Sequence, residues 1–373
     1  MVFHALPRWR AKTLYLGCHR RHFAKSLLFF KHRPALARAG ALRLDYHVGM
    51  SFFALLFAFL LEQARPLSFG EGLERACQTW CDKVRQSLDT GDSRHAWTAW
   101  AVAMGVPCVV VVAVHLLLAW YLGWIFAMVW SVAVLYATLG FRHFSHHFTS
   151  IRQALSVGDE VMANSLLSQW SGAKGENLSR AEIIRHVIEY SAIAAHRHVF
   201  GVVVWFVVLA ALGLGPVGAV IYRLSEFLSR SWGTKDDVAA STLGHNSPAL
   251  ETCAAKAWRN TDWLPARFTA LSFAVVGNFE DAVQAWRNDA LHFPDSNDGV
   301  VLAATSGAIN VRLGGKNLGQ ADEEQLLNPQ AVETTAGREP ELSHLRSMVG
   351  LVWRAVVMWM LLLALLTLAR LLG

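Results

Sequence analysis

Residues 95–141, HAWTAWAVAMGVPCVVVVAVHLLLAWYLGWIFAMVWSVAVLYATLGF, contain no Asp, Glu, Lys or Arg. A helix that crosses a bilayer needs about 20 apolar residues, so this uncharged run is long enough for two crossings. We predict two arms, Trp97–Leu118 and Trp124–Leu139, with the chain reversing at Tyr121–Gly123. Trp and Tyr crowd the ends of these arms, as in the aromatic belts of membrane proteins. The sequence therefore predicts a tight hairpin of membrane helices.

Further apolar segments lie on both sides of this hairpin. Ser51–Leu61 is predicted to be a short membrane or interfacial helix, and Gly350–Leu372 a C-terminal crossing. Val199–Tyr222 contains Pro216, so it forms either one crossing or a re-entrant pair. Only 17% of the residues are charged, against roughly a quarter in soluble domains. We therefore predict an all-α, polytopic integral membrane protein with about four to five membrane helices and cytoplasmic helical segments.

The net charge of +6 comes from the first 49 residues. They hold ten of the 34 Lys/Arg and one of the 28 Asp/Glu, which leaves 24 basic and 27 acidic side chains for the rest of the chain. A nucleic-acid partner is not expected, because such partners need a basic face on the folded domain. We predict that residues 1–49 are a mis-assigned upstream start before Met50. The alternative is a basic arm on an anionic membrane surface.

The remaining chain is predicted to have three parts. Residues 50–315 form the membrane domain, residues 316–346 an acidic linker, and residues 347–373 a C-terminal membrane helix. Basic residues flank the hairpin on both sides, which places both flanking segments in the cytoplasm. The segment 142–197 is expected to be helical, with a turn at Gly158-Asp159 and a capping box at Ser179 and Glu182.

Common catalytic and metal-binding motifs are absent from the sequence. There is no complete phosphate-binding loop, HExxH or GxSxG pattern, and the five cysteines form no CxxC pair. His143, His146 and His147 could share one helix face, but no nearby carboxylate completes a metal site. The sequence therefore leaves the metal ligands, if any, unknown.

Several spaced patterns occur in a specific order along the chain. They are Tyr136, Thr138-Leu139, Arg142, His147, Ala154-Leu155 and Gly158-Asp159; then Trp263–Ala270 (WLPARFTA); then Ala285–Ala290 (AWRNDA); then Asn297–Gly299, Ala303-Ala304, Gly307-Ala308 and Val311–Gly315. Together they resemble the CobD/CbiB family of cobalamin-biosynthesis membrane proteins, from about Met50 to Gly315. The segment Asp262–Arg267 also resembles AmpE, a membrane protein linked to β-lactamase regulation.

The resemblance implies a multi-pass protein of the bacterial inner membrane, in contact with the lipid bilayer. Enzymatic members attach aminopropanol phosphate to adenosylcobyric acid as an amide, with ATP and Mg²⁺ as cofactors and a corrinoid as substrate. Activating a carboxylate calls for arginines, backbone N–H groups or a metal beside phosphates. The implied catalytic residues are Asp159, Glu189 and Asp289. The implied substrate-binding residues are Arg142, His147, Arg267, Asn297, Gly299, Arg312, Gly314 and Gly315.

The sequence also departs from the family pattern. Val301 and Leu302 stand where the family has Pro and Glu, and a leucine can neither bind a metal nor accept a proton. The alternative is a non-catalytic, AmpE-like regulator or assembly partner with other membrane proteins as partners and no cofactor. ATP chemistry would require Arg142 and Asn297–Gly315 on the same side of the membrane. Either Val199–Tyr222 then folds back, or Phe268–Gly277 completes a second crossing.

Overall fold

The computed structural model describes residues 51–64, 70–172, 178–233, 247–315 and 334–372. Leu44–Gly373 forms one compact unit, which contains all of them. The predicted leader, residues 1–49, and most of the predicted acidic linker, residues 316–333, lie outside the described residues. The described residues form helices, with two isolated β-bridges and no strand.

The predicted hairpin is present. A short apolar helix at Ser51–Ala64 comes first, followed by α3, Gly70–Leu88. The two arms are α4, Ser93–Tyr121, and α5, Trp124–Thr138. Gly123 joins them with a φ of 97°, a conformation that glycine adopts without strain.

The segment after the hairpin is helical, as predicted, and its local signals are confirmed. Helix α6, Phe141–Val157, ends at Gly158, whose backbone is left-handed. Asp159 then caps α7, Glu160–Ser171, by accepting a hydrogen bond from Met162 N. Helix α8, Arg180–Ala195, begins with the capping box of Ser179 and Glu182, in which both reciprocal hydrogen bonds are present.

The chain folds back at Leu212–Pro216, within the predicted segment Val199–Tyr222, and the candidate membrane span that ends there begins at Arg180, inside the segment predicted to be cytoplasmic. Helix α8 continues through a π-helical turn, η1, His196–Phe200, into α9, Gly201–Ala211. After the turn, α10, Val217–Trp232, packs along α9. A Cβ atom at Gly218 would clash with the carbonyl of Trp205, so the close approach of α9 and α10 depends on this glycine.

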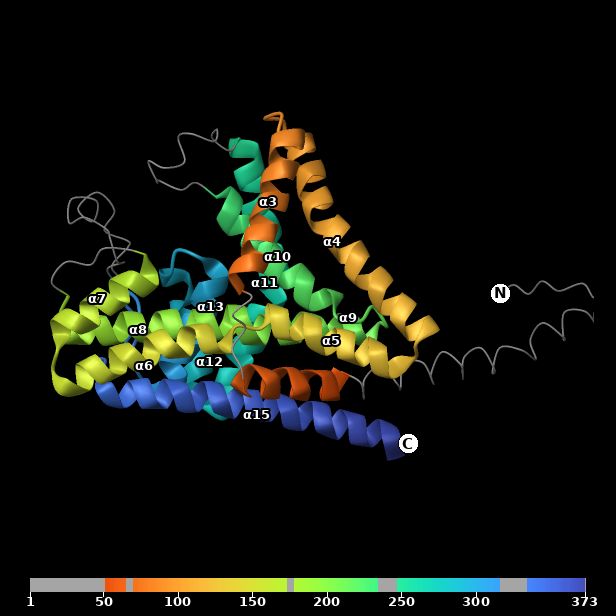
Figure 1. Ribbon diagram of the computed structural model, residues 1–373. Coiled ribbons are helices and arrows are strands. Elements are labelled where there is room, and N and C mark those ends of the chain that lie inside the picture. The colour runs from red at the N-terminus through yellow and green to blue at the C-terminus, as the bar shows by residue number, and fades with distance from the viewer. Residues whose placement is uncertain (1–50, 65–69, 173–177, 234–246, 316–333, 373) are drawn as a thin grey trace, which may run out of the picture. The chain divides into compact units, whose positions relative to one another are not determined.

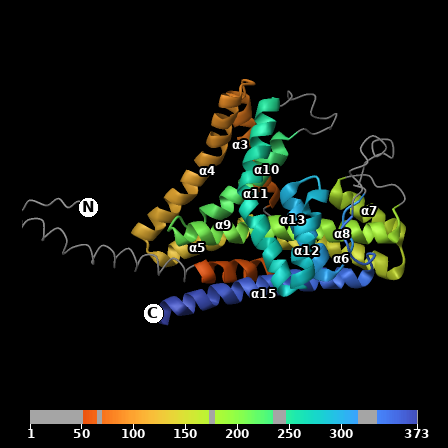
Figure 2. The same cartoon turned by 180° about the vertical axis from the view of Figure 1, so that it is seen from behind.

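The last part of the chain covers and crosses these helices. Helix α11, Pro248–Val276, runs across α8 and the C-terminal helix α15, Leu342–Leu372 (Figures 1 and 2). In the chain, three elements lie between α11 and α15: α12, Phe279–Asp289, the short η3, Ala290–His292, and α13, Ser296–Ile309. The largest apolar core lies where α8, α11, α13 and α15 meet.

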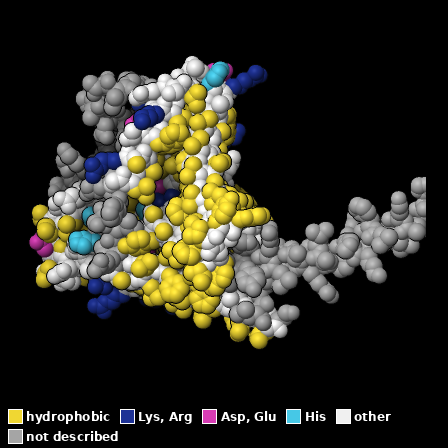
Figure 3. Space-filling model, turned by 45° about the vertical axis from the view of Figure 1, so that its right-hand side comes forward, with side chains coloured by type: hydrophobic (Ala, Val, Ile, Leu, Met, Phe, Trp, Pro, Cys, Tyr) yellow, Lys and Arg dark blue, Asp and Glu magenta, His cyan; other side chains and the backbone are white. Residues whose placement is uncertain are grey.

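Three of the described helices are long and apolar enough to cross a membrane: Ser93–Tyr121, Arg180–Ala211 and Leu342–Ala369. Ser51–Ala64 and Trp124–Thr138 are shorter apolar helices. Large apolar side chains on the hairpin are exposed, such as Trp120 at 81% and Val109 at 67%. Figure 3 shows hydrophobic side chains gathered over one face. Such a surface is unfavourable in water and suits lipid, so the prediction of an all-α membrane protein is confirmed.

Candidate functional site

Helices α8 and α13 run in opposite directions, and polar contacts join them at both ends. Arg185, early in α8, bonds to Gly314, which follows the end of α13. Arg197, in the π-helical turn after α8, bonds to Asp298 at the start of α13. Arg185 and Arg197 are about 18 Å apart along the helix axis, at 1.5 Å per residue. The structure therefore has two separate polar clusters. The first includes Arg185 and Gly314, and the second lies beside the contact between Arg197 and Asp298.

The first cluster consists of four residues that bond to one another: Arg185, His186, Glu189 and Gly314. Glu189 Oε1 accepts a hydrogen bond from Gly314 N at 2.7 Å, and Arg185 Nη1 donates to Gly314 O at 2.5 Å. His186 Nδ1 lies 3.2 Å from Glu189 Oε2. Gly314 and Gly315 have φ values of 85° and 99°, which glycine allows. Both oxygens of Glu189 have partners, so this cluster anchors the segment that leaves α13.

The second cluster is the Asp262 network, which consists of His196, Tyr222, Asp262 and Thr269. Asp262 Oδ1 accepts a hydrogen bond from Tyr222 Oη at 2.7 Å and lies 2.9 Å from His196 Nε2. His196 Nδ1 lies 2.9 Å from Thr269 Oγ1. All four side chains are buried. The ring of Tyr222 covers Gly201, where any Cβ atom would clash with it.

One oxygen of this buried carboxylate has no partner. Asp262 Oδ2 is inaccessible and makes no hydrogen bond to any described residue. Leaving such an oxygen unsatisfied costs roughly 1–3 kcal/mol, so it needs a partner beyond the described residues, such as a water, an ion or a ligand. Burial raises the pKa of Asp262, but the charge and hydrogen bond of His196 and the hydrogen bond of Tyr222 outweigh it, and the net pKa lies below the usual value. The carboxylate is therefore ionised at neutral pH.

Arg197 and Asp298 form an ion pair beside the Asp262 network. Arg197 Nη2 donates to Asp298 Oδ2 at 2.6 Å, and the two side chains are 26% and 20% exposed. Asp298 Oδ1 and Arg197 Nε are buried without a hydrogen-bond partner among the described residues. Burial raises the pKa of Asp298, and Arg197 offsets only part of that effect. This pair therefore combines a partly accessible charge with an unused carboxylate oxygen.

Arg267 lies at the corner between α11 and α13. Its Nη1 donates to Asn297 Oδ1 and to Trp263 O, both at 2.9 Å, and its guanidinium lies 4.4 Å above the Trp263 ring. Asn297 Nδ2 donates to Arg259 O at 2.9 Å, so the buried amide of Asn297 is satisfied. Arg267 is partly exposed, and its other donors have no partner among the described residues. They are suited to an anionic group.

The structure brings five of the predicted residues to these clusters. Glu189, Gly314 and Gly315 belong to the first cluster, and Arg267 and Asn297 lie beside the second. Gly299 is also close to Asn297, but its place is explained by packing. A Cβ atom at Gly299 would clash with the carbonyl of Ala290.

The other predicted residues have different surroundings. Asp159 is the cap of α7, and Asp289 accepts from Ala336 N at 3.4 Å. Arg312 is exposed, and its backbone N donates to Arg338 O. His147 stacks on Trp170, with ring centroids 6.0 Å apart. The side chain of Arg142 lies outside the described part of the structure. Catalytic or binding roles for these residues stay predictions.

Sequence reasoning missed His196, Tyr222, Asp262, Arg197 and Asp298 as site residues. Asp262 opens the segment that ends with Arg267, and Asp298 lies between Asn297 and Gly299, so both could have been included with these motifs. Tyr222 had no sequence signal, because only the packing of α10 on α11 brings it to Asp262. Among the described residues, no group of three or more His, Cys, Asp or Glu side chains is arranged to hold a metal.

Comparison with known proteins assigns the chain to a family. The model of the family described as "CobD/Cbib protein" matches residues 53–352. The chain belongs to the CobD/CbiB family. This membership confirms the resemblance found in the sequence, and the matches give no support to the AmpE-like alternative.

Relatives in the CobD/CbiB family are moderately similar to this chain. "Cobalamin biosynthesis protein CobD" of Stutzerimonas stutzeri is 27% identical over 322 residues, which cover 84% of this chain and 96% of that protein. The protein of the same name in Chromobacterium violaceum is 32% identical over 184 residues, 49% of this chain and 55% of that protein. No solved structure matches the chain.

The structure also shows what surrounds the residues that depart from the family pattern. Val301 is fully buried and Leu302 is 8% exposed, and both belong to the core around α8 and α13. Leu302 lies one helical turn after Asp298, so both are on the same side of α13. Where the resemblance implies a glutamate, this CobD/CbiB protein has an apolar contact, and its nearest acidic side chain on that face of α13 is Asp298.

Proposed function

We propose that this chain is a multi-pass protein of the bacterial inner membrane that acts in cobalamin biosynthesis and attaches aminopropanol phosphate to adenosylcobyric acid as an amide, using ATP. Family membership supports the pathway, and the three candidate membrane helices support the location. The observation that carries the catalytic proposal is the Arg197–Asp298 pair at the edge of the Asp262 network. It provides a cation, a partly accessible carboxylate and an oxygen without a partner.

Amide formation requires the primary ammonium group of the amine to lose a proton before it attacks. Asp298 is suited to accept that proton, because its raised pKa brings it closer to a useful base strength and Oδ1 has no partner among the described residues. Arg197 holds the carboxylate in place through the 2.6 Å contact. The Asp262 network supports this arrangement from the interior, because His196 precedes Arg197 in the same π-helical turn.

Arginines are suited to the anionic groups of this reaction. Arg267 has guanidinium donors without a partner among the described residues and is fixed by its bonds to Asn297 and Trp263. Planar guanidinium groups bind phosphates and carboxylates through two parallel hydrogen bonds. We therefore assign Arg267 to the phosphate or carboxylate of a substrate.

The residues present are compatible with ATP and Mg²⁺. Nucleotide-bound Mg²⁺ usually needs one or two protein carboxylates, because phosphates and waters supply its other ligands. Asp262 has a carboxylate oxygen without a partner among the described residues, and it is the residue that would contact the ion, which leaves Asp298 as the proton acceptor. When bound, Mg²⁺ would neutralise phosphate charge. The reversal at Leu212–Pro216 supports a cytoplasmic site, because it allows the segments before α9 and after α10 to lie on one side.

Complementation tests this function. A bacterial strain that lacks the synthase, supplied with cobyric acid, should regain cobalamin-dependent growth with the wild-type chain. Asp298→Asn should abolish the rescue, whereas Glu74→Gln, which removes an exposed carboxylate from α3, should keep it. Immunoblots of the membrane fraction verify equal insertion. Failure of the inserted wild-type protein, or full rescue by Asp298→Asn, would contradict the proposal.

A further inference from the structure

One face of α11 is exposed along most of the helix, and its side chains change from basic to apolar half-way. Its members are spaced three or four residues apart, as expected for a single helical face: Lys256, Arg259, Trp263, Arg267, Leu271 and Val275. The first half is basic, and the second is apolar, with Leu271 44% and Val275 55% exposed. Between Thr252 and Val276 the only acidic residue is Asp262, which is buried. The exposed face is therefore cationic and then hydrophobic.

The apolar half of α11 contacts a candidate membrane helix. The rings of Phe268 and Trp359 lie 6.0 Å apart, and Trp359 Nε1 donates to Ser272 Oγ at 2.9 Å. Trp359 lies within the candidate span Leu342–Ala369 of α15, whereas α11 is not among the candidate spans. In Figures 1 and 2, α11 crosses α15 instead of running beside it. Helix α11 therefore meets the membrane part of the protein at an angle.

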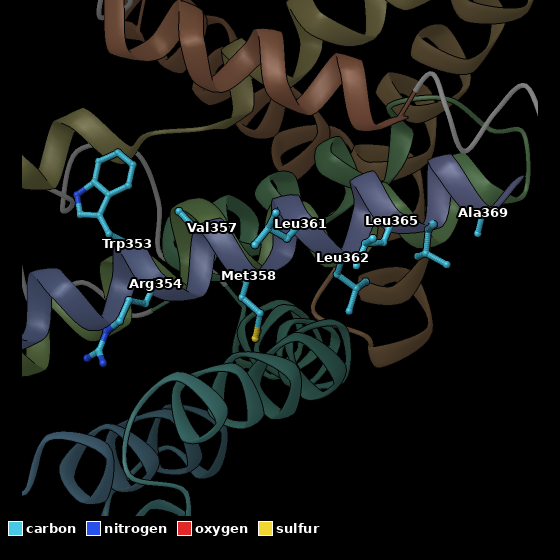
Figure 4. A pocket seen from close by; sticks show the side chains of 9 residues that line it. Trp353, Arg354, Val357, Met358, Leu361, Leu362, Leu365 and Ala369 are labelled. Atoms are coloured by element: carbon cyan, nitrogen blue, oxygen red, sulfur yellow. The ribbon is translucent and has the colours of Figure 1, made fainter. Parts of the chain in front are cut away.

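The exposed face of α15, on the side of the helix opposite to Trp359, shows the same order of a cation followed by apolar side chains. This face begins with Trp353 and Arg354 and continues along Val357, Leu361 and Leu365 (Figure 4). Arg354 precedes Trp359 by about 7 Å along the helix. Arg354 therefore lies before the point at which α11 crosses α15, and the apolar side chains of Leu361 and Leu365 lie after it.

We propose that α11 is an interfacial helix whose exposed face binds the headgroups of anionic phospholipids. Lys256 and Arg259 lie over the phosphates, Trp263 lies at the interface, and Leu271 and Val275 enter the acyl region. Trp is enriched at this depth in membrane proteins, and basic residues near an anionic surface strengthen attraction to it. The partner is a lipid surface and not a soluble anion, because exposed apolar residues continue the same face.

The proposal has a consequence for the candidate site. Arg267 lies on this face at the boundary between its basic and apolar halves, and it also bonds to Asn297 at the start of α13. The outer edge of the site then lies at the lipid–water boundary. This inference goes beyond the proposed function, and its tests measure lipid binding without any enzymatic readout.

Lipid retention tests the charge of the face. The full chain is extracted from vesicles of phosphatidylglycerol and phosphatidylcholine, and mass spectrometry measures the retained lipids. The wild type should be enriched in phosphatidylglycerol. Lys256→Gln/Arg259→Gln should lower that enrichment about 25-fold, since each of the two basic residues near such a surface is worth about fivefold. The matched control Lys83→Gln/Arg152→Gln removes two exposed charges from α3 and α6 and should change it little. Equal retention by the test variant and the wild type, or an equal loss in the control, would overturn the proposal.

Fluorescence tests the depth of the face. The difference in emission between the wild type and Trp263→Phe isolates the signal of Trp263, which is 52% exposed. In nanodiscs, lipids brominated near the glycerol should quench this signal, and aqueous iodide should not. The opposite pattern would place Trp263 in water and rule out the interfacial position.

Discussion

Arg197 donates to Asp298 at 2.6 Å, although 101 residues separate them in the chain. The contact joins the π-helical turn after α8 to the first turn of α13. π-Helical turns often occur at functional sites, where they change the direction of a side chain within a helix. The pair also lies beside Asn297 and Arg267, which the family resemblance had selected. Mutation of this pair is therefore the most direct test of the candidate site in this CobD/CbiB protein.

Replacing Arg197 should move the pH dependence of catalysis. The positive charge of Arg197 lowers the pKa of Asp298, which burial otherwise raises. Arg197→Gln removes that charge, so the pKa of Asp298 rises further, and the acidic limb of the kcat/KM profile moves to higher pH. A profile of amide formation against pH in reconstituted membranes measures the shift. An unchanged acidic limb would show that Asp298 is not the proton acceptor.

Tyr222→Phe should destabilise the folded protein. The substitution removes the hydroxyl that donates to the ionised Asp262 at 2.7 Å and leaves the ring in place, so the expected loss is about 1.5–3 kcal/mol. Thermal unfolding in detergent measures it. Tyr121→Phe is the control, because Tyr121 is 76% exposed. Equal melting temperatures for the two variants would argue against the Tyr222–Asp262 hydrogen bond.

Asp262 should contribute stability that is lost in acid. Its folded pKa lies below the usual 3.8, so the stabilisation is fully present above that pH and disappears as the pH falls through the folded value. The difference in melting temperature between the wild type and Asp262→Asn should therefore shrink below about pH 4. A difference that is constant from neutral to acidic pH would contradict this prediction. Asp289→Asn serves as the matched carboxylate control.

Gly218→Ala should disturb the reversal between α9 and α10. A methyl group at this position would clash with the carbonyl of Trp205, and backbone atoms yield less easily than side chains. Overpacking of this kind costs typically 1–3 kcal/mol. Gly105→Ala in α4 is the control, because a Cβ atom there meets open space. The yield of folded protein and its melting temperature should fall for Gly218→Ala alone.

Glu189→Ala should loosen the segment after α13. The carboxylate accepts from Gly314 N at 2.7 Å, and its loss also leaves Arg185 without its acidic partner. Hydrogen exchange measured by mass spectrometry should increase in peptides that contain residues 311–315. Peptides from α3 should exchange as in the wild type. An unchanged exchange rate at 311–315 would show that other contacts hold this segment, and that Glu189 is available for another role.

The amino-acid sequence by itself determined the membrane hairpin, the turn at Gly158-Asp159, the cap of α8 and the family. Each depends on neighbours in the chain or on an ordered set of motifs, and hydrophobic periodicity and capping act within a few residues. It also selected Glu189 and Gly314, which the structure places in the first cluster, and Arg267 and Asn297, which it places beside the second.

Only the tertiary structure decided which side chains meet. His196 and Asp262 are 66 residues apart, and Arg185 and Gly314 are 129 apart. Their contacts depend on the angles at which whole helices cross, and these angles result from packing of the apolar faces. The same packing turned Val199–Tyr222 back on itself and left the basic and apolar face of α11 exposed across α15. No local pattern encodes these arrangements, because their energy comes from contacts between distant segments.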